Sequence, residues 1–409
     1  MGDRVHVALF TDFHPDTLGG VQTAMRSLCD GLRGLGHRVT VFTAPAPGSV
    51  LGDADTVVLS ASPFSMSNGL PMVLPSRANQ RLIDAALRAR DIDVIHSLTT
   101  YGAGIAGIRA ARRHGVPLVQ TMQSRDDTVI EKYSPAPYLA AWMMRWVHGR
   151  FVPLRRQPPF AGDSRTARLA WRPLIAQAQA ADRVIVPTNH FARRLADRGV
   201  DRPIHVVSNG IDDALLDRVR NERSASRNTH APLRVLWCGR LSAEKRPIEA
   251  IQVVGLVPDC TLDIYGSGPL ADRAAAAAAD LPDRVRLHGR VDQASCLAAM
   301  GAHDLLLLTS DCDTQGMVLL EAVAMGLPVL YCDPELSETV PAQGGIRTTD
   351  ASVESFAAEL AALALDRNRL STMVEALTAH AEEPRQSRHL TDIVSVYTDA
   401  MSRKSTTAR

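Results

Sequence analysis

The chain has 409 residues, 45% of them hydrophobic and 22% charged, which is typical of a globular protein and argues against a disordered or fibrous one. At roughly 100–200 residues per domain, this length predicts two domains. Lysine plus arginine (45) nearly balances aspartate plus glutamate (44), so the net charge of +1 gives no overall attraction to nucleic acid.

The cysteines and the ends of the chain indicate the compartment. The six cysteines form no CxxC pair and no metal-ligand spacing, so we expect reduced thiols in a protein core. Asp3 and Arg4 open the chain just before a predicted strand, which does not fit a signal peptide. The longest charge-free run, 56–76, is rich in Ser, Pro, Gly and Asn and is not expected to span a membrane. The sequence therefore predicts a cytoplasmic protein.

In the first half of the chain, short runs of β-branched apolar residues alternate with longer helical runs. Helices are expected at Val21–Leu35, Arg81–Ala89 and Ala103–Arg113. The predicted strands are Val5–Phe10, Val39–Thr43, Thr56–Leu59, Val94–His96, Leu118–Thr121, Val184–Val186 and His205–Val207. Such alternation predicts a doubly wound parallel sheet.

The same pattern starts again after a polar stretch, Asp217–Pro232, which is the predicted linker. The second set of strands is Arg234–Cys238, Thr261–Tyr265, Val285–Leu287, Leu305–Thr309 and Pro328–Tyr331. The helices between them are Ala243–Leu256, Ala271–Ala279, Ser295–Gly301 and Met317–Met325. We therefore predict an α/β fold of two Rossmann-like domains, 1–216 and 217–385. Ligands of such sheets bind beyond the carboxyl ends of the strands, and two domains facing each other would place a cleft there.

Three strand-to-helix loops carry residues suited to phosphate. The first, Thr11–Val21, contains Gly19 and Gly20, whose backbone amides would reach an anion at a helix N-terminus. The second, Trp237–Arg246, contains Arg240 and Lys245 as a cationic clamp for a diphosphate. Lysine is rare here, with three lysines against 42 arginines, which favours a specific role for Lys245 over a solvated one.

The third loop, Asp311–Ala322, leads from a strand into an apolar helix. Gly316 and the next amides would form a helix N-terminus suited to phosphate. Glu321 lies one turn into this apolar helix, where a carboxylate must be paired or bound to a ligand such as ribose hydroxyls. A salt-bridged core glutamate is the alternative.

Weaker candidates lie elsewhere. Asp91–Asp93 and Asp311–Asp313 fit DxD, a pattern that can hold Mn²⁺ or Mg²⁺, but the first precedes its strand and the second overlaps the loop above. His14 and His96 each end a strand and could line an acceptor site. Met143–Arg156 mixes apolar residues with four arginines, typical either of a solvated helix or of an interfacial membrane helix.

Together the glycine loop, GRLSAEKR (239–246) and the D-x7-E pair ending in EAVAMGLPV resemble the retaining glycosyltransferases of family 4, which have the two-domain GT-B fold. The NGID segment Asn209–Asp212 and the loop Tyr265–Pro269 resemble further elements of that family. The resemblance implies an acceptor-binding domain (1–216), a nucleotide-sugar-binding domain (217–385) and a C-terminal helix (386–409) that crosses back to the first domain.

The resemblance also implies roles for individual residues. Arg240 and Lys245 would neutralise the diphosphate leaving group, Glu321 would hold the ribose and Asp313 would contact the donor sugar. The other implied donor-binding residues are Gly19, Gly20, Gly266, Arg290, Val291, Gln315, Gly316, Met317 and Val318.

The chain departs from the family pattern at two positions. Asp313 stands where the family usually has the first glutamate of an E-x7-E pair, and its reach is shorter by about one C–C bond. Gln123 lies in the loop where the family commonly has a histidine, and glutamine is no general base. The acceptor would then be deprotonated by Asp126, by Asp127 or by the leaving phosphate, or it would be a thiol that needs little activation.

The sequence thus predicts a retaining, nucleotide-sugar-dependent glycosyltransferase without cofactor or metal and without a nucleic-acid partner. We expect a small-molecule acceptor in specialised-metabolite biosynthesis. The alternatives are a glycolipid-synthesising enzyme at a membrane surface, a nucleotide-sugar epimerase, a phosphorylase of the same fold and a sugar-nucleotide binder without activity.

Overall fold

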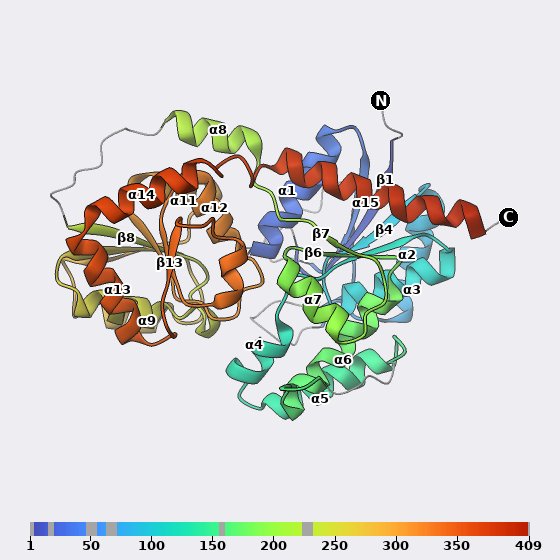
Figure 1. Ribbon diagram of the computed structural model, residues 1–409. Helices are drawn as coiled ribbons and strands as arrows, with labels where there is room; N and C mark the ends of the chain where they lie inside the picture. Colours follow the sequence, from blue (N-terminus) through green and yellow to red (C-terminus); the bar gives the residue numbers. More distant parts are fainter. Residues whose placement is uncertain are drawn as a thin grey trace. The chain divides into compact units, whose positions relative to one another are not determined.

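The computed structural model describes residues 4–14, 20–45, 55–62, 72–154, 160–222 and 232–407. The chain forms two compact units, one made of Met1–Ser208 with His389–Arg409 and the other of Asn209–Arg388 (Figure 1). Each unit is built on its own parallel sheet.

In the described part of the first unit, seven strands form one sheet in the order β3-β2-β1-β4-β5-β6-β7. Its central strands are buried along their whole length, which is why they read as continuous apolar runs in the sequence. Ala8 and Phe10 of β1 pack into one core cluster, while Val7 and Leu9 pack into another on the opposite face. The strands are β1 (His6–Thr11), β2 (Arg38–Thr43), β3 (Thr56–Val58), β4 (Val94–Ser97), β5 (Leu118–Thr121), β6 (Arg183–Val186) and β7 (Ile204–Val206).

Helices follow nearly every strand of this unit. Ser76 and Ser164 cap two of them by accepting hydrogen bonds from backbone N–H groups of the first turn. The helices are α1 (Gly20–Gly34), α2 (Arg77–Ala89), α3 (Gly102–His114), α4 (Asp126–Tyr133), α5 (Pro137–Gly149), α6 (Arg165–Ala180) and α7 (Asn189–Asp197).

The second unit repeats the plan with a sheet in the order β10-β9-β8-β11-β12-β13. Val235 and Trp237 of β8 lie in one core cluster, and Leu236 and Cys238 lie in the cluster on the other face. The strands are β8 (Leu233–Cys238), β9 (Cys260–Tyr265), β10 (Val285–Gly289), β11 (Leu305–Leu308), β12 (Val329–Tyr331) and β13 (Gly345–Arg347). These observations confirm the prediction of two Rossmann-like α/β domains.

The helices of the second unit alternate with these strands, and two short 3₁₀ turns, Ala243–Lys245 and Pro334–Glu338, lie between them. They are α8 (Asp213–Asn221), α9 (Pro247–Leu256), α10 (Ala271–Ala278), α11 (Gln293–Ala302), α12 (Met317–Met325), α13 (Val353–Leu365) and α14 (Arg367–Thr378).

The boundary between the units differs from the predicted one. The division falls between Ser208 and Asn209 rather than after residue 216, and α8 belongs to the second unit. The predicted linker, Asp217–Pro232, therefore begins inside a helix, because Val219 of that polar-looking segment and Leu216 just before it are buried in the core of the second unit. Its residues 223–231 lie outside the described part of the chain.

The last helix, α15 (Gln386–Thr407), packs on the first unit through its apolar side. Tyr397 of this helix is buried and its hydroxyl bonds His96 Nδ1 of β4 at 2.7 Å. Asp399 pairs with Arg183 of β6, whose Nη2 donates to Asp399 Oδ1 at 2.9 Å. Residues far apart in the sequence thus fasten the C-terminal helix to the first sheet.

Candidate functional site

The loop after β8 carries the first part of the site. A 3₁₀ turn, Ala243–Lys245, ends at Arg246, which has φ of 55°, and α9 begins only at Pro247. The predicted helix from Ala243 was therefore wrong at its start, since a proline fits the first turn of a helix better than its interior. The Thr309 hydroxyl, just past β11, lies 2.9 Å from the carbonyl oxygens of both Lys245 and Arg246 and fixes the backbone there.

Lys245 and Asp313 form an ion pair between the loops that follow β8 and β11. Burial would lower the pKa of Lys245, but the charge and hydrogen bond of Asp313 raise it, and the net shift is upward. The other carboxylate oxygen, Asp313 Oδ2, is buried and has no hydrogen-bond partner among the described residues. The pair thus leaves a cationic amine 27% exposed beside an acceptor oxygen with unused capacity.

The helix N-terminus predicted at Gly316 is present. Gly316, with φ of 75°, precedes the first helical residue of α12, Met317, and Val318 follows in the first turn. Such a backbone favours glycine, and it leaves the first N–H groups of the helix without intrahelical partners. Asn209 fixes the side chain of Gln315, whose Oε1 accepts hydrogen bonds from Asn209 N at 3.1 Å and Asn209 Nδ2 at 2.9 Å.

Glu321 is buried on α12 and is not salt-bridged to a basic side chain in the described part of the chain. Gln293 of α11 donates from Nε2 to Glu321 Oε1 at 2.7 Å. Burial raises the pKa of Glu321 to about 7, and the hydrogen bond from Gln293 opposes that shift. Sequence reasoning missed Gln293, because only the topology of the sheet brings the start of α11 beside α12.

Two glycines bring the loops after β8 and β9 together. Gly266 has φ of 150°, and a Cβ placed there would lie 1.8 Å from the carbonyl oxygen of Gly239. Gly239 N donates to Tyr265 O at 3.0 Å, and Gly266 N donates to Gly289 O at 2.8 Å. Gly266 therefore allows the loops after β8 and β9 to approach each other closely.

The remaining donor-side candidates lie at the same carboxyl edge of the second sheet. Arg240 is half-buried in the loop after β8, and burial lowers its pKa while Glu244 opposes the shift. Arg290 is exposed and Val291 half-buried in the loop after β10. The roles of all these residues toward a donor stay predictions.

The acceptor-side candidates lie in the first unit. Gly19 falls outside the described residues, Gly20 is the first residue of α1, and His14 is buried after β1. Asp126 accepts hydrogen bonds from Thr100 Oγ1 at 2.8 Å and from the Tyr101 hydroxyl at 3.0 Å.

The other acidic candidate, Asp127, follows Asp126 in the first turn of α4, and Gln123 lies in the loop just before that helix. Burial raises the pKa of Asp126, which fits a group able to take a proton. Asp127 instead pairs with Arg125, whose Nε lies 3.2 Å from Asp127 Oδ1. Gln123 is half-buried in the loop between β5 and α4. The roles of these three residues toward an acceptor stay predictions.

His96 does not line an open site, contrary to the expectation from its position at the end of a strand. Its side chain is fully buried, and its Nε2 lies 2.6 Å from Thr121 Oγ1 while Nδ1 contacts Tyr397. Burial lowers the pKa of His96 to about 3, so it stays neutral near neutral pH. His96 is a structural residue that holds α15 to the sheet.

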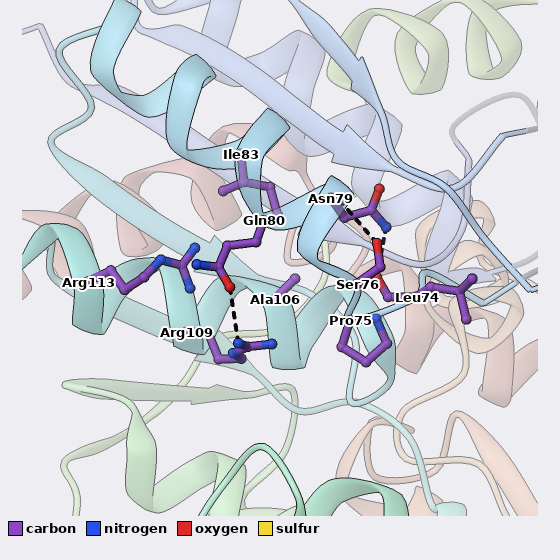
Figure 2. A pocket seen from close by; sticks show the side chains of 9 residues that line it. All are labelled: Leu74, Pro75, Ser76, Asn79, Gln80, Ile83, Ala106, Arg109 and Arg113. Carbon is purple, nitrogen blue, oxygen red and sulfur yellow. Dashed lines mark hydrogen bonds between the residues drawn. The ribbon is translucent and has the colours of Figure 1, made fainter.

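A small surface pocket lies between α2 and α3 of the first unit (Figure 2). Arg109 Nη2 donates to Gln80 Oε1 at 3.2 Å within it, and Asn79 Nδ2 donates to Leu74 O at 2.7 Å. Its polar groups therefore satisfy one another, and it contains none of the predicted site residues.

The described part of the chain contains neither a metal-ligand cluster nor a membrane-spanning helix. No group of three or more His, Cys, Asp or Glu side chains gathers there as a metal-ligand set. Asp93 of the first DxD sequence caps the amino end of β1 instead, accepting from His6 N at 2.7 Å. No described helix combines the length and the apolar character needed to span a bilayer.

Comparison with known proteins covers both units. Residues 18–215 match the model of Glycosyltransferase Family 4, and residues 232–366 match that of Glycosyl transferases group 1. A GDP-mannose-dependent alpha-mannosyltransferase of Mycolicibacterium smegmatis is 27% identical over 339 residues, covering 80% of each chain. The alpha-monoglucosyldiacylglycerol synthase of Streptococcus pneumoniae is 22% identical over 352 residues, covering 82% of this chain and 73% of that one.

Solved structures share the fold. Sucrose-phosphate synthase from Thermosynechococcus elongatus superposes with a TM-score of 0.74 at 18% identity, covering 98% of this chain and 100% of the other. Anabaena HepE in complex with UDP and glucose gives a TM-score of 0.66 at 17% identity, with 97% and 100% covered. The family matches, the paired parallel sheets and these neighbours agree: the chain belongs to the family 4 glycosyltransferases of GT-B fold, enzymes that transfer sugars from nucleotide-sugar donors.

Proposed function

We propose that the chain transfers a hexose from a nucleoside diphosphate hexose to an acceptor hydroxyl, with retention of anomeric configuration and without a metal ion. The observation that carries the proposal is the Lys245–Asp313 pair at the carboxyl edge of the second sheet, beside the N-terminus of α12. It combines a cation, a carboxylate with an unpartnered oxygen and free backbone N–H groups, which suit a phosphate next to a sugar hydroxyl.

The diphosphate would be the leaving group. Lys245, Arg240 and the first N–H groups of α12 would stabilise the negative charge that develops on it as the bond from the anomeric carbon to its oxygen breaks. These positively charged and N–H groups would do the charge stabilisation that a metal ion does in other transferases. The proposal also includes Arg290 and Val291, which would lie near the nucleotide base. Gly266 would contribute by allowing the loops after β8 and β9 to approach each other closely.

The sugar and the ribose would each meet one carboxyl group. Asp313 Oδ2 has capacity to accept a hydrogen bond from a hydroxyl of the donor sugar. Glu321 would accept from the ribose hydroxyls, which would favour its ionised form over the protonated form that burial favours.

The acceptor would approach the same face of the sugar that the leaving group occupies. Its oxygen would bond to the anomeric carbon, and its proton would pass to the oxygen of the departing diphosphate. This route needs no general base and fits a chain with Gln123 in place of a histidine. In this proposal Gln123 orients the acceptor, while Asp126 is the carboxyl group able to take the proton if the phosphate does not.

A hydroxyl acceptor is preferred here over the thiol that the sequence left as one option. The names of the relatives give no support to a thiol or to a specialised metabolite, and one names a diacylglycerol glycolipid as product. For the compartment we propose the cytoplasm, since the six cysteines, all within the described part of the chain, form no disulfide bond.

The experiment is a donor panel of UDP- and GDP-hexoses incubated with the protein, with and without water-soluble and lipid acceptors. Release of nucleoside diphosphate that depends on an acceptor, with a product of unchanged anomeric configuration by NMR, is expected. Sugar-nucleotide conversion without any acceptor would instead show an epimerase, and tight nucleotide binding without product would show a binder without activity.

A further inference from the structure

Helix α5 presents an apolar face to solvent in the first unit. The face is formed by residues spaced four apart in two adjacent rows, so they lie on one side of the helix. The opposite side, with Ala141, Met144 and His148, is buried against the unit. The exposed residues, with their exposed fractions, are Tyr138 (56%), Leu139 (56%), Trp142 (42%), Met143 (38%) and Trp146 (50%).

This arrangement reverses the ordinary pattern of a surface helix, in which the outward side is polar. The helix packs inward on α6 and α4, and Figure 1 shows it at the outer edge of that layer of helices. The rings of Trp142 and Trp146 stack on each other, with centroids 6.4 Å apart and planes 12° from parallel. A contiguous aromatic patch on a surface marks a place where something apolar binds.

The segment that contains this helix carries lysine and arginine but no acidic residue. Between Glu131 and Asp163 the sequence has five lysine and arginine residues, of which Arg155 and Arg156 lie outside the described part of the chain. Among the five, Arg150 has its guanidinium carbon 5.1 Å from the centre of the Trp146 ring. A binding partner of this face must therefore offer an apolar surface to the tryptophan rings and negative charge to the basic side chains.

We propose that this face docks on the surface of a membrane that contains anionic lipids, with α5 lying in the plane of the interface. Tryptophan and tyrosine collect at the level of lipid headgroups, where one part of the ring is apolar and another is wet. Basic side chains beside them are attracted to anionic headgroups, and a helix of this kind binds without crossing the bilayer. A second copy of this chain is a poorer occupant, because a symmetric contact would bring two equally basic surfaces together.

The face is linked to the acceptor-side loops by hydrogen bonds. His148, on the buried side of α5, bonds through Nε2 to the carbonyl oxygen of Thr100, which Gln177 also contacts. The hydroxyl of that same Thr100 bonds Asp126. Docking of α5 would thus hold these loops near lipid, a consequence that rests on the proposed function, whereas the docking itself does not.

The test is co-sedimentation of the full chain with vesicles of pure phosphatidylcholine or of phosphatidylcholine and phosphatidylglycerol at about 7:3. We expect binding to the anionic vesicles that falls at high salt, and at least a tenfold loss of partitioning in the double variant W142S/W146S. Leu365→Ser is the matched control, since Leu365 is an exposed leucine of α13 in the other unit, 87% exposed, and binding should not change.

Tryptophan fluorescence gives an independent readout. Trp171 and Trp237 are each only 2% exposed, so a blue shift on adding anionic vesicles, or quenching by brominated lipid, reports Trp142 and Trp146. Nucleoside diphosphate binding by W142S/W146S should stay at the wild-type level, which shows that the variant is folded and separates docking from the donor site.

Three results would overturn the proposal. One is the absence of binding to anionic vesicles, and another is binding that survives in W142S/W146S. The third is a dimer of the wild-type chain in solution, without lipid, that W142S/W146S converts to monomer, which would assign the face to a second copy.

Discussion

Gln293 donates a hydrogen bond to Glu321 across the start of α11 and the middle of α12, with Nε2 and Oε1 separated by 2.7 Å. The amide orients the carboxyl group but does not neutralise it, because an amide carries no charge. Glu321 is consequently held in a buried position at a cost to stability, which is typical of a group kept for binding rather than for folding.

Substituting Glu321 with Gln should stabilise the unliganded protein at alkaline pH. The pKa of Glu321 rises from 4.5 to about 7 on folding, so the folded state binds more protons than the unfolded state between these values, and stability falls as the pH rises through that window. The variant lacks this loss and should gain up to about 3 kcal/mol above pH 7. Thermal unfolding at pH 4.5 and pH 8 measures it. An equal difference between variant and wild type at both pH values would contradict the assignment.

Lys245 and Asp313 should show strong coupling in a double-mutant cycle. Lys245→Met alone removes the partner of Asp313 and leaves a mostly buried carboxylate without a counter-charge, which should destabilise the protein by about 1–3 kcal/mol. Adding Asp313→Asn should recover much of that loss. Additive effects in denaturant unfolding would show that the two side chains do not interact.

Gly266 should tolerate no side chain. Gly266→Ala would place a Cβ 1.8 Å from the carbonyl oxygen of Gly239, so the loops after β8 and β9 must separate, and both stability and donor binding should fall. Gly289→Ala is the control, since Gly289 also has positive φ (69°) but no atom within 4 Å of its Cβ position; its cost should be about 1 kcal/mol. Similar losses in the two variants, by calorimetry, would argue against the close approach.

His96→Gln should reduce stability without reducing turnover per folded molecule. His96 is buried between Thr121 and Tyr397, and the loss of those hydrogen bonds should cost about 1–3 kcal/mol. Because the folded-state pKa of His96 is lowered to about 3, wild-type stability falls as the pH drops below about 6.5, and this part should be missing in the variant. A large drop in kcat with unchanged unfolding would restore His96 to the acceptor site.

The sequence predicted the central strands well because both of their faces are buried, so Val5–Phe10 and Leu305–Thr309 appear as unbroken apolar runs. The sequence also indicated that the candidate loops lie along one edge of the sheet, because the carboxyl ends of parallel strands share one edge. The sequence did not predict contacts between elements that only the sheet topology brings together. Examples are the hydrogen bond from Gln293 to Glu321 and those from Thr309 to the backbone of the loop after β8.

The sequence also did not predict which individual side chains are buried. His96 lies near the end of β4, yet its side chain is buried because Tyr397 of α15 covers it. The sequence indicated a helix over Met143–Arg156, whereas α5 spans Pro137–Gly149, and only the structure shows that Trp142 and Trp146 lie outside the core.

The proposed diphosphate site depends most on the two cationic side chains Lys245 and Arg240. The most direct measurement is calorimetric titration of a nucleoside diphosphate, without its sugar, into the wild-type protein, Arg240→Gln, Lys245→Gln and the double variant. Each single variant should raise Kd by about 10–100-fold, which corresponds to the loss of a charge-assisted hydrogen bond, and turnover should fall with it. Affinity and turnover that both stay at the wild-type level in the double variant would contradict the site proposed for the diphosphate.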